Sequence, residues 1–286
     1  MTSLIGWAGG KHYLADWIIS HFPQHETYVE VFGGAAHVLL KKQPSKLEIY
    51  NDLSKDLANL FWVAKMHPTE LQKEFELMPY SKVLYTRYLE LWKEGMAECD
   101  EVRCAAVFMY LANASFQGII GTGYRTSSLY SGGHKAHSLA SKVAHITPLS
   151  ERCREIEMLC HDWRWVLKQY DYPTTLFYLD PPYAGCKVYS HMKNANWTLD
   201  DMQELADALQ NIKGKAIVSH HETPEIDAMF EGWHKDTKEV PIHMAYSPTN
   251  PHKKRKIEAL YMNFDPRTAT SHPDQTTLMD GFNGRH

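Results

Sequence analysis

The stretch Thr175-Leu176-Phe177-Tyr178-Leu179-Asp180-Pro181-Pro182-Tyr183 says most about the fold. Its first half is an unbroken run of apolar, aromatic and β-branched side chains, which predicts a buried strand. The proline pair ends this strand, because proline cannot donate a hydrogen bond to a neighbouring strand. The acidic and aromatic residues beside the prolines therefore stand at the carboxyl end of a strand, where open α/β sheets bind their ligands.

Two earlier segments end in the same manner. Residues 27–32 form a short β-rich run that ends in Gly33-Gly34, and residues 47–50 form another that ends in Asn51-Asp52. A helical pattern follows each of them. Strands that alternate with helices are typical of a mostly parallel α/β sheet. We therefore predict such a sheet, with the three strand ends contributing to one crevice.

The alternation stops after residue 64. Helical patterns follow at residues 70–77, 82–92 and 102–116. Residues 118–147 are rich in glycine, serine, histidine and tyrosine, for which we expect a loop or a hairpin rather than core. We predict that residues 65–148 form an inserted, mostly helical subdomain.

Strands and helices alternate again from residue 156 onward, and Thr198 is placed to cap a helix over residues 199–211. The main domain is therefore predicted to consist of residues 1–64 and 149–264. The composition of residues 265–286, rich in proline, threonine, serine and glycine, is typical of a flexible tail.

The composition sets limits on the class of protein. With 286 residues and 44% hydrophobic content, the chain can fill a core. No stretch approaches about 18 uncharged apolar residues and no basic leader precedes an apolar run, so we expect a cytoplasmic protein without a membrane partner. The cysteines show no zinc-like spacing, so we expect reduced thiols and no metal. The net charge of −4 neither indicates nor excludes nucleic acid. No obligate protein partner is evident.

The glycine turn and Asp52 have the arrangement of a nucleoside site. Missing side chains at Gly33-Gly34 let a ligand approach the backbone, and an acidic residue about 20 positions further on accepts ribose hydroxyls in nucleotide-binding sheets. Both features also suit simpler roles, since a glycine pair forms ordinary turns and Asp52 could cap the following helix. The incomplete GxGxxG pattern disfavours a nicotinamide dehydrogenase.

The residues Asp180 to Tyr183 suit chemistry on an aromatic amine, whose conjugated lone pair makes it a poor nucleophile. The Asp180 carboxylate and a backbone carbonyl held by Pro181 can accept the two amine hydrogens and favour a pyramidal nitrogen. The Pro181-Pro182 pair makes both acceptors rigid. The ring of Tyr183 can stack on a base that has been pulled out of a duplex.

Four motifs together resemble those of Dam-type DNA adenine methyltransferases: Gly6-Trp7-Ala8-Gly9-Gly10-Lys11, Val29-Glu30-Val31-Phe32-Gly33-Gly34-Ala35, Asn51-Asp52-Leu53 and Asp180-Pro181-Pro182-Tyr183. Their order also matches, so the resemblance covers roughly residues 4–264. It implies a Rossmann-like methyltransferase sheet with an inserted target-recognition subdomain, S-adenosylmethionine as cofactor, and double-stranded DNA as partner. The implied catalytic residues are Asp180, Pro181, Pro182 and Tyr183. The implied cofactor contacts are Trp7, Lys11, Phe32, Gly34, Asp52 and Asp180, and the loop over residues 184–196 would close on the flipped base.

The chain departs from the family pattern at two places. Ala36 stands where the family usually has a second glycine, which should be tolerable because alanine adds one methyl group. The insert lacks the Asn-Arg, Asn-Gly and Arg hairpin of members that read GATC. Its candidate DNA-reading residues are Asn113, Gln117 and Arg125, too few for a four-base reader, so we expect methylation of adenine in many contexts, with at most a short preferred sequence. A different hairpin that still reads a specific site is the alternative for the same residues.

A basic turn precedes the last predicted strand, at residues 252–256. By resemblance, Lys253, Lys254 and Arg255 contact DNA phosphates, although a solvated turn fits the same residues.

Several other activities compete with adenine methylation. Methylation of the cytosine exocyclic amine uses similar geometry, but its tetrapeptide more often begins with serine. Methylation of protein glutamine usually begins its tetrapeptide with asparagine and has no recognition insert. Methylation of the cytosine ring needs a cysteine after a proline, which this chain lacks. A DNA-binding protein without turnover would also keep the fold, although the motif is intact.

Overall fold

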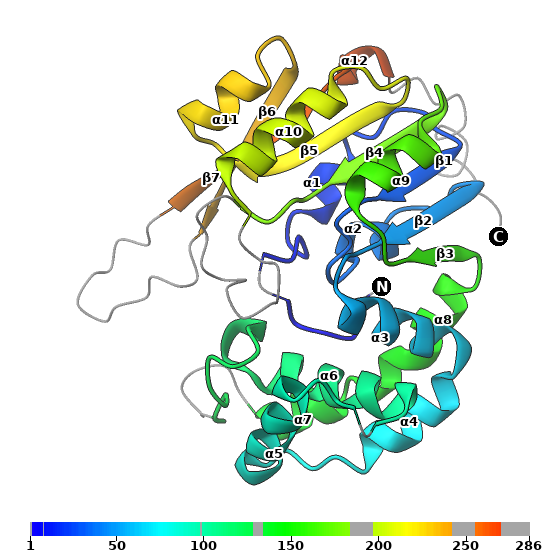
Figure 1. The fold of residues 1–286 in the computed structure, drawn as a ribbon, viewed down its shortest axis with the longest axis vertical. Helices are drawn as coiled ribbons and strands as arrows, with labels where there is room; N and C mark the ends of the chain where they lie inside the picture. The colour runs from blue at the N-terminus through cyan, green and yellow to red at the C-terminus, as the bar shows by residue number, and fades with distance from the viewer. Residues whose placement is uncertain are drawn as a thin grey trace, which may run out of the picture.

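The computed structural model describes residues 2–7, 9–97, 99–127, 134–183, 197–241 and 255–269. Its strands are β1 (Thr27–Glu30), β2 (Leu47–Asn51), β3 (Ile156–Leu159), β4 (Thr175–Leu179), β5 (Lys215–His221), β6 (His234–Pro241) and β7 (Arg255–Met262). They form one seven-stranded sheet in the order β3-β2-β1-β4-β5-β7-β6 (Figure 1). The first five strands run parallel, and β7 is antiparallel to both of its neighbours. The predicted α/β, Rossmann-like sheet is confirmed.

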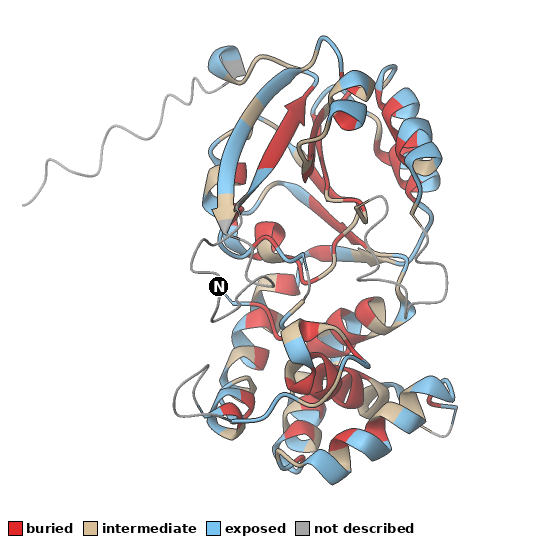
Figure 2. Ribbon diagram, turned by 90° about the vertical axis from the view of Figure 1, so that its left-hand side faces the viewer, coloured by how far each residue is buried: buried red, intermediate tan, exposed pale blue. Residues whose placement is uncertain are grey.

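Helices cover both faces of this sheet. Those of the described residues are α1 (Ala15–Ile19), α2 (His37–Lys41), α3 (Lys55–Met66), α4 (Pro68–Glu76), α5 (Lys82–Lys93), α6 (Glu101–Ala114), α7 (Lys135–Ala140), α8 (Ile146–Cys153), α9 (Trp163–Tyr170), α10 (Leu199–Leu209), α11 (Pro224–Met229) and α12 (Pro266–Ala269). Alternate strand residues face opposite ways. Val29 and Phe177 pack with α9, α10 and α11, whereas Tyr28 and Tyr178 pack on the side of α1, α2 and α3. Figure 2 shows buried residues along the strands and on the helix faces turned toward them.

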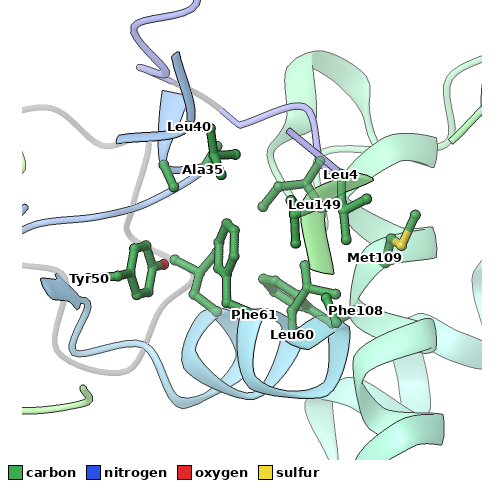
Figure 3. Close-up of a cluster of buried hydrophobic side chains, with 14 of the residues drawn as sticks. Leu4, Ala35, Leu40, Tyr50, Leu60, Phe61, Phe108, Met109 and Leu149 are labelled. Atoms are coloured by element: carbon green, nitrogen blue, oxygen red, sulfur yellow. The ribbon is translucent and has the colours of Figure 1, made fainter. Parts of the chain in front are cut away.

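The helices α3 to α8 share their apolar core with the sheet. Tyr50 of β2, Phe61 of α3 and Phe108 of α6 belong to one buried cluster (Figure 3). Helix α6 is apolar on nearly every face and lies at the centre of the helical region, because residues 105–112 are all buried. The boundaries predicted for the insert therefore enclose helices that bury their apolar side chains against the main domain. The division into domains stays a prediction.

Side-chain caps define where many helices begin. Ser54, Ser81 and Asp100 each accept a hydrogen bond from a backbone N–H of the first helical turn. Thr198 and Asp201 form a reciprocal capping box at the start of α10. The predicted cap at Thr198 is confirmed.

The structure differs from the sequence-based expectation in three places. Within residues 118–147, expected to be a loop or hairpin, Lys135–Ala140 form α7 and α8 begins at Ile146, because Leu139 and Ile146 are buried in the core. Strand β6 escaped prediction, since its sequence HKDTKEVP is that of a polar edge strand. At the start of the segment predicted as a flexible tail, Pro266–Ala269 form the short helix α12, and residues 270–286 of that segment lie outside the described residues. Among the described residues, no helix has both the length and the apolar character needed to cross a bilayer.

Candidate active site

The site lies where the direction of strand connection reverses. From β1 the chain continues to β2 on one side, while β4 lies against the other side of β1 and leads to β5. The carboxyl ends of adjacent parallel strands on either side of such a reversal leave a crevice for ligands. Gly33, Asp52 and Asp180 all follow these strand ends, as predicted.

The glycine turn is fixed to the end of β2. The Gly34 N–H donates to Asp52 Oδ2 at 2.8 Å, and the Gly33 N–H donates to the Asn51 carbonyl at 2.7 Å. A side chain at Gly33 would put its Cβ 2.2 Å from the Tyr50 ring, so only glycine fits there. The close packing of the turn on Tyr50 explains Gly33 without any ligand.

Asp52 does not cap the following helix. That cap is Ser54, whereas Asp52 accepts from the N–H groups of Ser54 and Gly34, each at 2.8 Å. Burial raises the pKa of Asp52 above its usual range, and these two hydrogen bonds oppose the shift. The carboxylate is thus held rigidly at the end of β2 and stays partly exposed.

Ala36 adopts a left-handed backbone conformation, with φ of 55°. Its methyl group is buried, so space was available for it. The cost of alanine at this position lies in the backbone instead, where an L-residue loses roughly 1–2 kcal/mol. That alanine is tolerable here stays a prediction, and the reason given for it leaves out this backbone cost.

The Asp180 carboxylate has one anchored oxygen and one open oxygen. Oδ1 accepts from Lys11 Nζ at 2.6 Å and Ser219 Oγ at 3.0 Å, with the Tyr183 hydroxyl 3.4 Å away. Within the described residues, Oδ2 has no hydrogen-bond partner, and the side chain is 19% exposed. The carboxylate is therefore fixed in orientation while it keeps an acceptor for a ligand.

Lys11 and Tyr183 join this carboxylate to a second one. The Tyr183 hydroxyl accepts from Lys11 Nζ at 2.6 Å and donates to Glu258 Oε1 at 2.5 Å. Lys11 Nζ also lies 3.2 Å from Glu258 Oε1. Because both bonding directions of the hydroxyl are used, the Tyr183 ring is held in one orientation.

The charges in this cluster shift each other's titration. Burial would lower the pKa of Lys11, but Asp180 and Glu258 outweigh it and raise that pKa. Burial raises the pKa of Asp180, and the negative charge of Glu258 adds to the shift against the opposing effect of Lys11. For Glu258, burial is outweighed by Lys11, His221 and Tyr183, which lower its pKa to about 2. Of the two carboxylates, Glu258 is therefore the one that stays ionised to lower pH.

Two histidines pack against Tyr183. The ring centroids of His220 and His221 lie 4.5 and 4.2 Å from that of Tyr183. His220 Nδ1 lies 2.9 Å from the His221 carbonyl, whereas its buried Nε2 has no partner among the described residues. Burial lowers the pKa of His220, so it stays neutral and adds no charge to the site.

An N-terminal segment, residues 3–7 and 9–11, connects the helical region to this cluster. Asn113 of α6 donates to the Leu4 carbonyl at 2.9 Å and accepts from the Gly6 N–H at 3.3 Å. A Cβ at Gly34 would lie 3.3 Å from the Trp7 ring, so the predicted cofactor contacts Trp7 and Gly34 are neighbours. The segment then ends at Lys11 in the cluster. Phe32, also predicted to touch the cofactor, packs edge-on against Trp197.

The predicted DNA-reading residues lie in different surroundings. Asn113 uses its amide to hold the N-terminal segment and to donate to Met109, which leaves no free N–H for a base. Gln117 and Arg125 lie in the hairpin (residues 115–125), where Ser115 pairs with Tyr124. Arg125 is exposed and Gln117 partly so. Contacts of these residues with DNA stay predictions.

The basic turn is only partly within the described residues. Lys253, Lys254 and the side chain of Arg255 lie outside them, as does the loop over residues 184–196. Lys256 is exposed, and its Nζ lies 3.2 Å from His221 Nε2.

Sequence reasoning missed Glu258. It lies in β7 and faces the same side of the sheet as Leu260 and Met262. Only 2% of its surface is exposed. A carboxylate within the otherwise apolar residues 257–262 of this strand was the available signal, because such a residue is rarely buried without a partner.

Similarity to known proteins extends over most of the chain. The model of the family described as D12 class N6 adenine-specific DNA methyltransferase matches residues 7–244. The chain is 25% identical to a DNA adenine methylase of Salmonella typhi over 276 residues, which cover 94% of this chain and 97% of the relative. It is 24% identical to that of Escherichia coli (strain K12) over 92% of this chain and 95% of the relative. The DNA adenine methylase of Haemophilus influenzae is 24% identical over 91% and 93%.

Proposed function

Because the chain belongs to the D12 class N6 adenine-specific DNA methyltransferase family, we propose that Asp180 to Tyr183 hold the exocyclic amine of a flipped adenine for methyl transfer from S-adenosylmethionine. Membership makes the chain an adenine-specific DNA methyltransferase that uses a methyl donor. The identity of that donor, the roles of single residues and the degree of sequence specificity are the proposal.

The half-anchored carboxylate of Asp180 carries this proposal. Oδ1 is fixed by Lys11 and Ser219, so Oδ2 presents a preorganised acceptor to one hydrogen of the amine. The backbone carbonyl held by Pro181 accepts the second hydrogen. Two acceptors on one nitrogen favour a pyramidal amine with its lone pair free, which is the form that attacks a methyl group.

Tyr183 supports the flipped base by stacking. Lys11 and Glu258 fix its hydroxyl, so the ring has one orientation before the base arrives. A rigid aromatic surface lowers the entropy lost when a base is ordered against it. The base must leave the duplex, because its amine is inaccessible within the stack.

The residues at the ends of β1 and β2 fit the methyl donor. Asp52 is a rigid, partly exposed carboxylate with lone pairs left for ribose hydroxyls. The Trp7 ring lies against Gly34 and offers an apolar surface. We assign Trp7, Lys11, Phe32, Gly34, Asp52 and Asp180 to this site. Lys11 contributes through its ion pairs with the Asp180 and Glu258 carboxylates. When bound, the donor supplies an electrophilic methyl group on a sulfonium.

We also propose that sequence specificity is relaxed. Bidentate reading of bases needs free amide or guanidinium groups, and the Asn113 amide is occupied by backbone. Gln117 and Arg125 are then the remaining candidates of the predicted set. Phosphate contacts would position the duplex without reading it.

One experiment tests both parts. The purified protein is incubated with mixed-sequence duplex DNA and S-adenosylmethionine, and modified bases are identified and mapped at single-base resolution. We expect N6-methyladenine in many contexts. Modified cytosine in place of modified adenine would contradict the catalytic assignment. So would adenine modification that persists in the Asp180→Ala variant. Methylation confined to one motif of four or more bases would contradict relaxed specificity alone.

A further inference from the structure

Glu258 is a buried carboxylate whose oxygens are both in use. Oε1 accepts from the Tyr183 hydroxyl at 2.5 Å and lies 3.2 Å from Lys11 Nζ. Oε2 lies 3.0 Å from His221 Nδ1. Its side chain is 3% exposed, within a strand whose other inward residues are apolar. Burying a charge in such surroundings is costly unless it is paired and hydrogen-bonded.

The Lys11 ammonium forms ion pairs with two carboxylates, those of Asp180 and Glu258. Lys11 Nζ lies 2.6 Å from Asp180 Oδ1 and 3.2 Å from Glu258 Oε1. The Tyr183 hydroxyl donates to Glu258 and lies only 3.4 Å from Asp180 Oδ1. Without Glu258, both Lys11 and Tyr183 would have Asp180 as their remaining anionic acceptor. Asp180 would then be more fully neutralised and a weaker acceptor for an amine hydrogen.

His221 fixes Glu258 from the other side. Lys256 Nζ lies 3.2 Å from His221 Nε2, and an ammonium can only donate, so Nε2 accepts. His221 Nδ1 then carries the proton and donates to Glu258 Oε2. The order from the surface inward is Lys256, His221, Glu258, followed by Tyr183 and Lys11. Every hydrogen bond in this series has a donor and an acceptor that match.

We infer that Glu258 is a positioning residue for methyl transfer: it holds the Tyr183 hydroxyl and part of the Lys11 charge, which keeps the Tyr183 ring fixed and Asp180 Oδ2 available for the adenine amine. The inference rests on the proposed function of Asp180 and Tyr183. Glu258 touches neither the base nor the methyl donor in this assignment. It acts through Lys11 and Tyr183.

The decisive variant is Glu258→Gln, which keeps the shape and the carbonyl acceptor but removes the charge. We expect the single-turnover rate at saturating DNA and methyl donor to fall by roughly 10- to 100-fold, because a small misplacement of reacting groups can cost about 100-fold in rate. Affinity for the methyl donor, measured by calorimetry, should change little. Glu157→Gln is the matched control. Glu157, on the edge strand β3, also accepts a hydrogen bond from a tyrosine hydroxyl, that of Tyr170 in α9.

The pH profile separates positioning from a merely structural role. Around Asp180 and Glu258, the charged and titratable groups of the described residues include Lys11, Glu30, Tyr178, Tyr183, His220, His221 and Lys256. The negative charge of Glu258 raises the pKa of Asp180. Removing that charge lowers the pKa, so Asp180 stays ionised to lower pH. The acid limb of the rate profile should therefore move to lower pH in Glu258→Gln.

The outcomes distinguish the inference from the function on which it rests. If the wild-type protein methylates no adenine, the proposed function fails. If the wild-type protein is active and Glu258→Gln matches it in rate and acid limb, the inference alone fails. A drop in thermal stability with an unchanged rate per folded molecule also overturns it. Should Glu258→Gln not fold, Tyr183→Phe removes the same contact while it keeps the ring, and a wild-type rate in that variant overturns the inference.

Discussion

The carboxyl end of the sheet and the hairpin over residues 115–125 hold their side chains in opposite ways. At the end of the sheet, Lys11, Asp180, Tyr183 and Glu258 are joined by short hydrogen bonds that use nearly every polar atom. In the hairpin, most hydrogen bonds join backbone atoms, Phe116 is 55% exposed, and Arg125 lies in solvent. The first region is organised before any substrate arrives. The second leaves Phe116 and Arg125 exposed, where the proposed contacts with DNA would be made.

This difference separates chemistry from target choice. Preorganised acceptors contribute to the rate because they need no rearrangement during reaction. A reader of sequence needs several correctly aimed donors, each worth about 1–3 kcal/mol of discrimination. If the two regions are as independent as their structures indicate, substitutions at the end of the sheet should change rate or donor affinity, and substitutions in the hairpin should change sequence preference.

The largest effect is expected at Asp180. Asp180→Ala removes the preorganised acceptor and should lower methyl transfer by about 3–4 kcal/mol of transition-state stabilisation. Single-turnover kinetics at saturating methyl donor measure this loss, because Asp180 is also assigned to the donor site. Asp171→Ala is the control, since Asp171 accepts from the N–H groups of Lys213 and Gly214 before the start of β5. Near-normal turnover in Asp180→Ala would remove the basis of the mechanism.

A smaller effect is expected at Asp52. Asp52→Ala should weaken binding of the methyl donor by roughly 1–3 kcal/mol, because a charge-assisted hydrogen bond to the ribose is lost. Calorimetry with S-adenosylmethionine measures it. Ser54→Ala removes the cap of α3 beside it and should cost about 1 kcal/mol of stability without changing affinity. If Asp52→Ala changes only thermal stability, its role is to hold Gly34 and Ser54.

The hairpin should respond differently. Gln117→Ala or Arg125→Ala should change the preference at a contacted base by no more than about 1–3 kcal/mol, while the rate at preferred sites stays close to wild type. Mapping of methylated adenines on a mixed-sequence substrate measures both quantities at once. A loss of rate in every context would show that the hairpin and the catalytic end are coupled, and would break the comparison.

The smallest effect concerns Ala36. Ala36→Gly relieves a left-handed alanine, worth roughly 1–2 kcal/mol, but loses a buried methyl group worth about 0.8 kcal/mol and adds the backbone freedom of glycine, which costs about 0.5–1 kcal/mol. These effects nearly cancel, so the free energy of unfolding should change by less than about 1 kcal/mol. Ala35→Gly loses a buried methyl group without such relief and should destabilise by about 1–2 kcal/mol. Denaturant unfolding of both variants measures the difference. Equal losses would show that the backbone at Ala36 carries no strain.

The parts predicted from the sequence are those in which neighbours in the chain remain neighbours in the site. The strand β4 and its motif at Asp180 are contiguous, and so are β1 with Gly33 and β2 with Asp52. Their placement at one edge followed from the rule for parallel strands. The sheet, the cap at Thr198 and the family were accessible for the same reason.

The parts that escaped prediction depend on residues distant in the chain. Glu258 gains its role from Lys11 and Tyr183, and no local pattern records those contacts. Asn113 is a residue type that can read a base, but its amide N–H donates to the Leu4 carbonyl, more than 100 positions away in the chain. Helices α7 and α8 were hidden because glycine and histidine nearby outweighed a few apolar residues that only the assembled core reveals.

The connection of Lys11 to the catalytic cluster constrains the order in which the active site can form during synthesis. Lys11 lies 169 positions before Asp180, and Tyr183 lies 75 positions before Glu258. At translation rates of about 5–20 residues per second, the first interval alone takes roughly 8–35 s. The ammonium of Lys11 is made early and has neither carboxylate during that time. A nascent chain that has released Asp180 to Tyr183 but not Glu258 therefore carries the catalytic motif without the network that orients it, and Lys11, made before both carboxylates, gains its full set of partners only after Glu258 has been made.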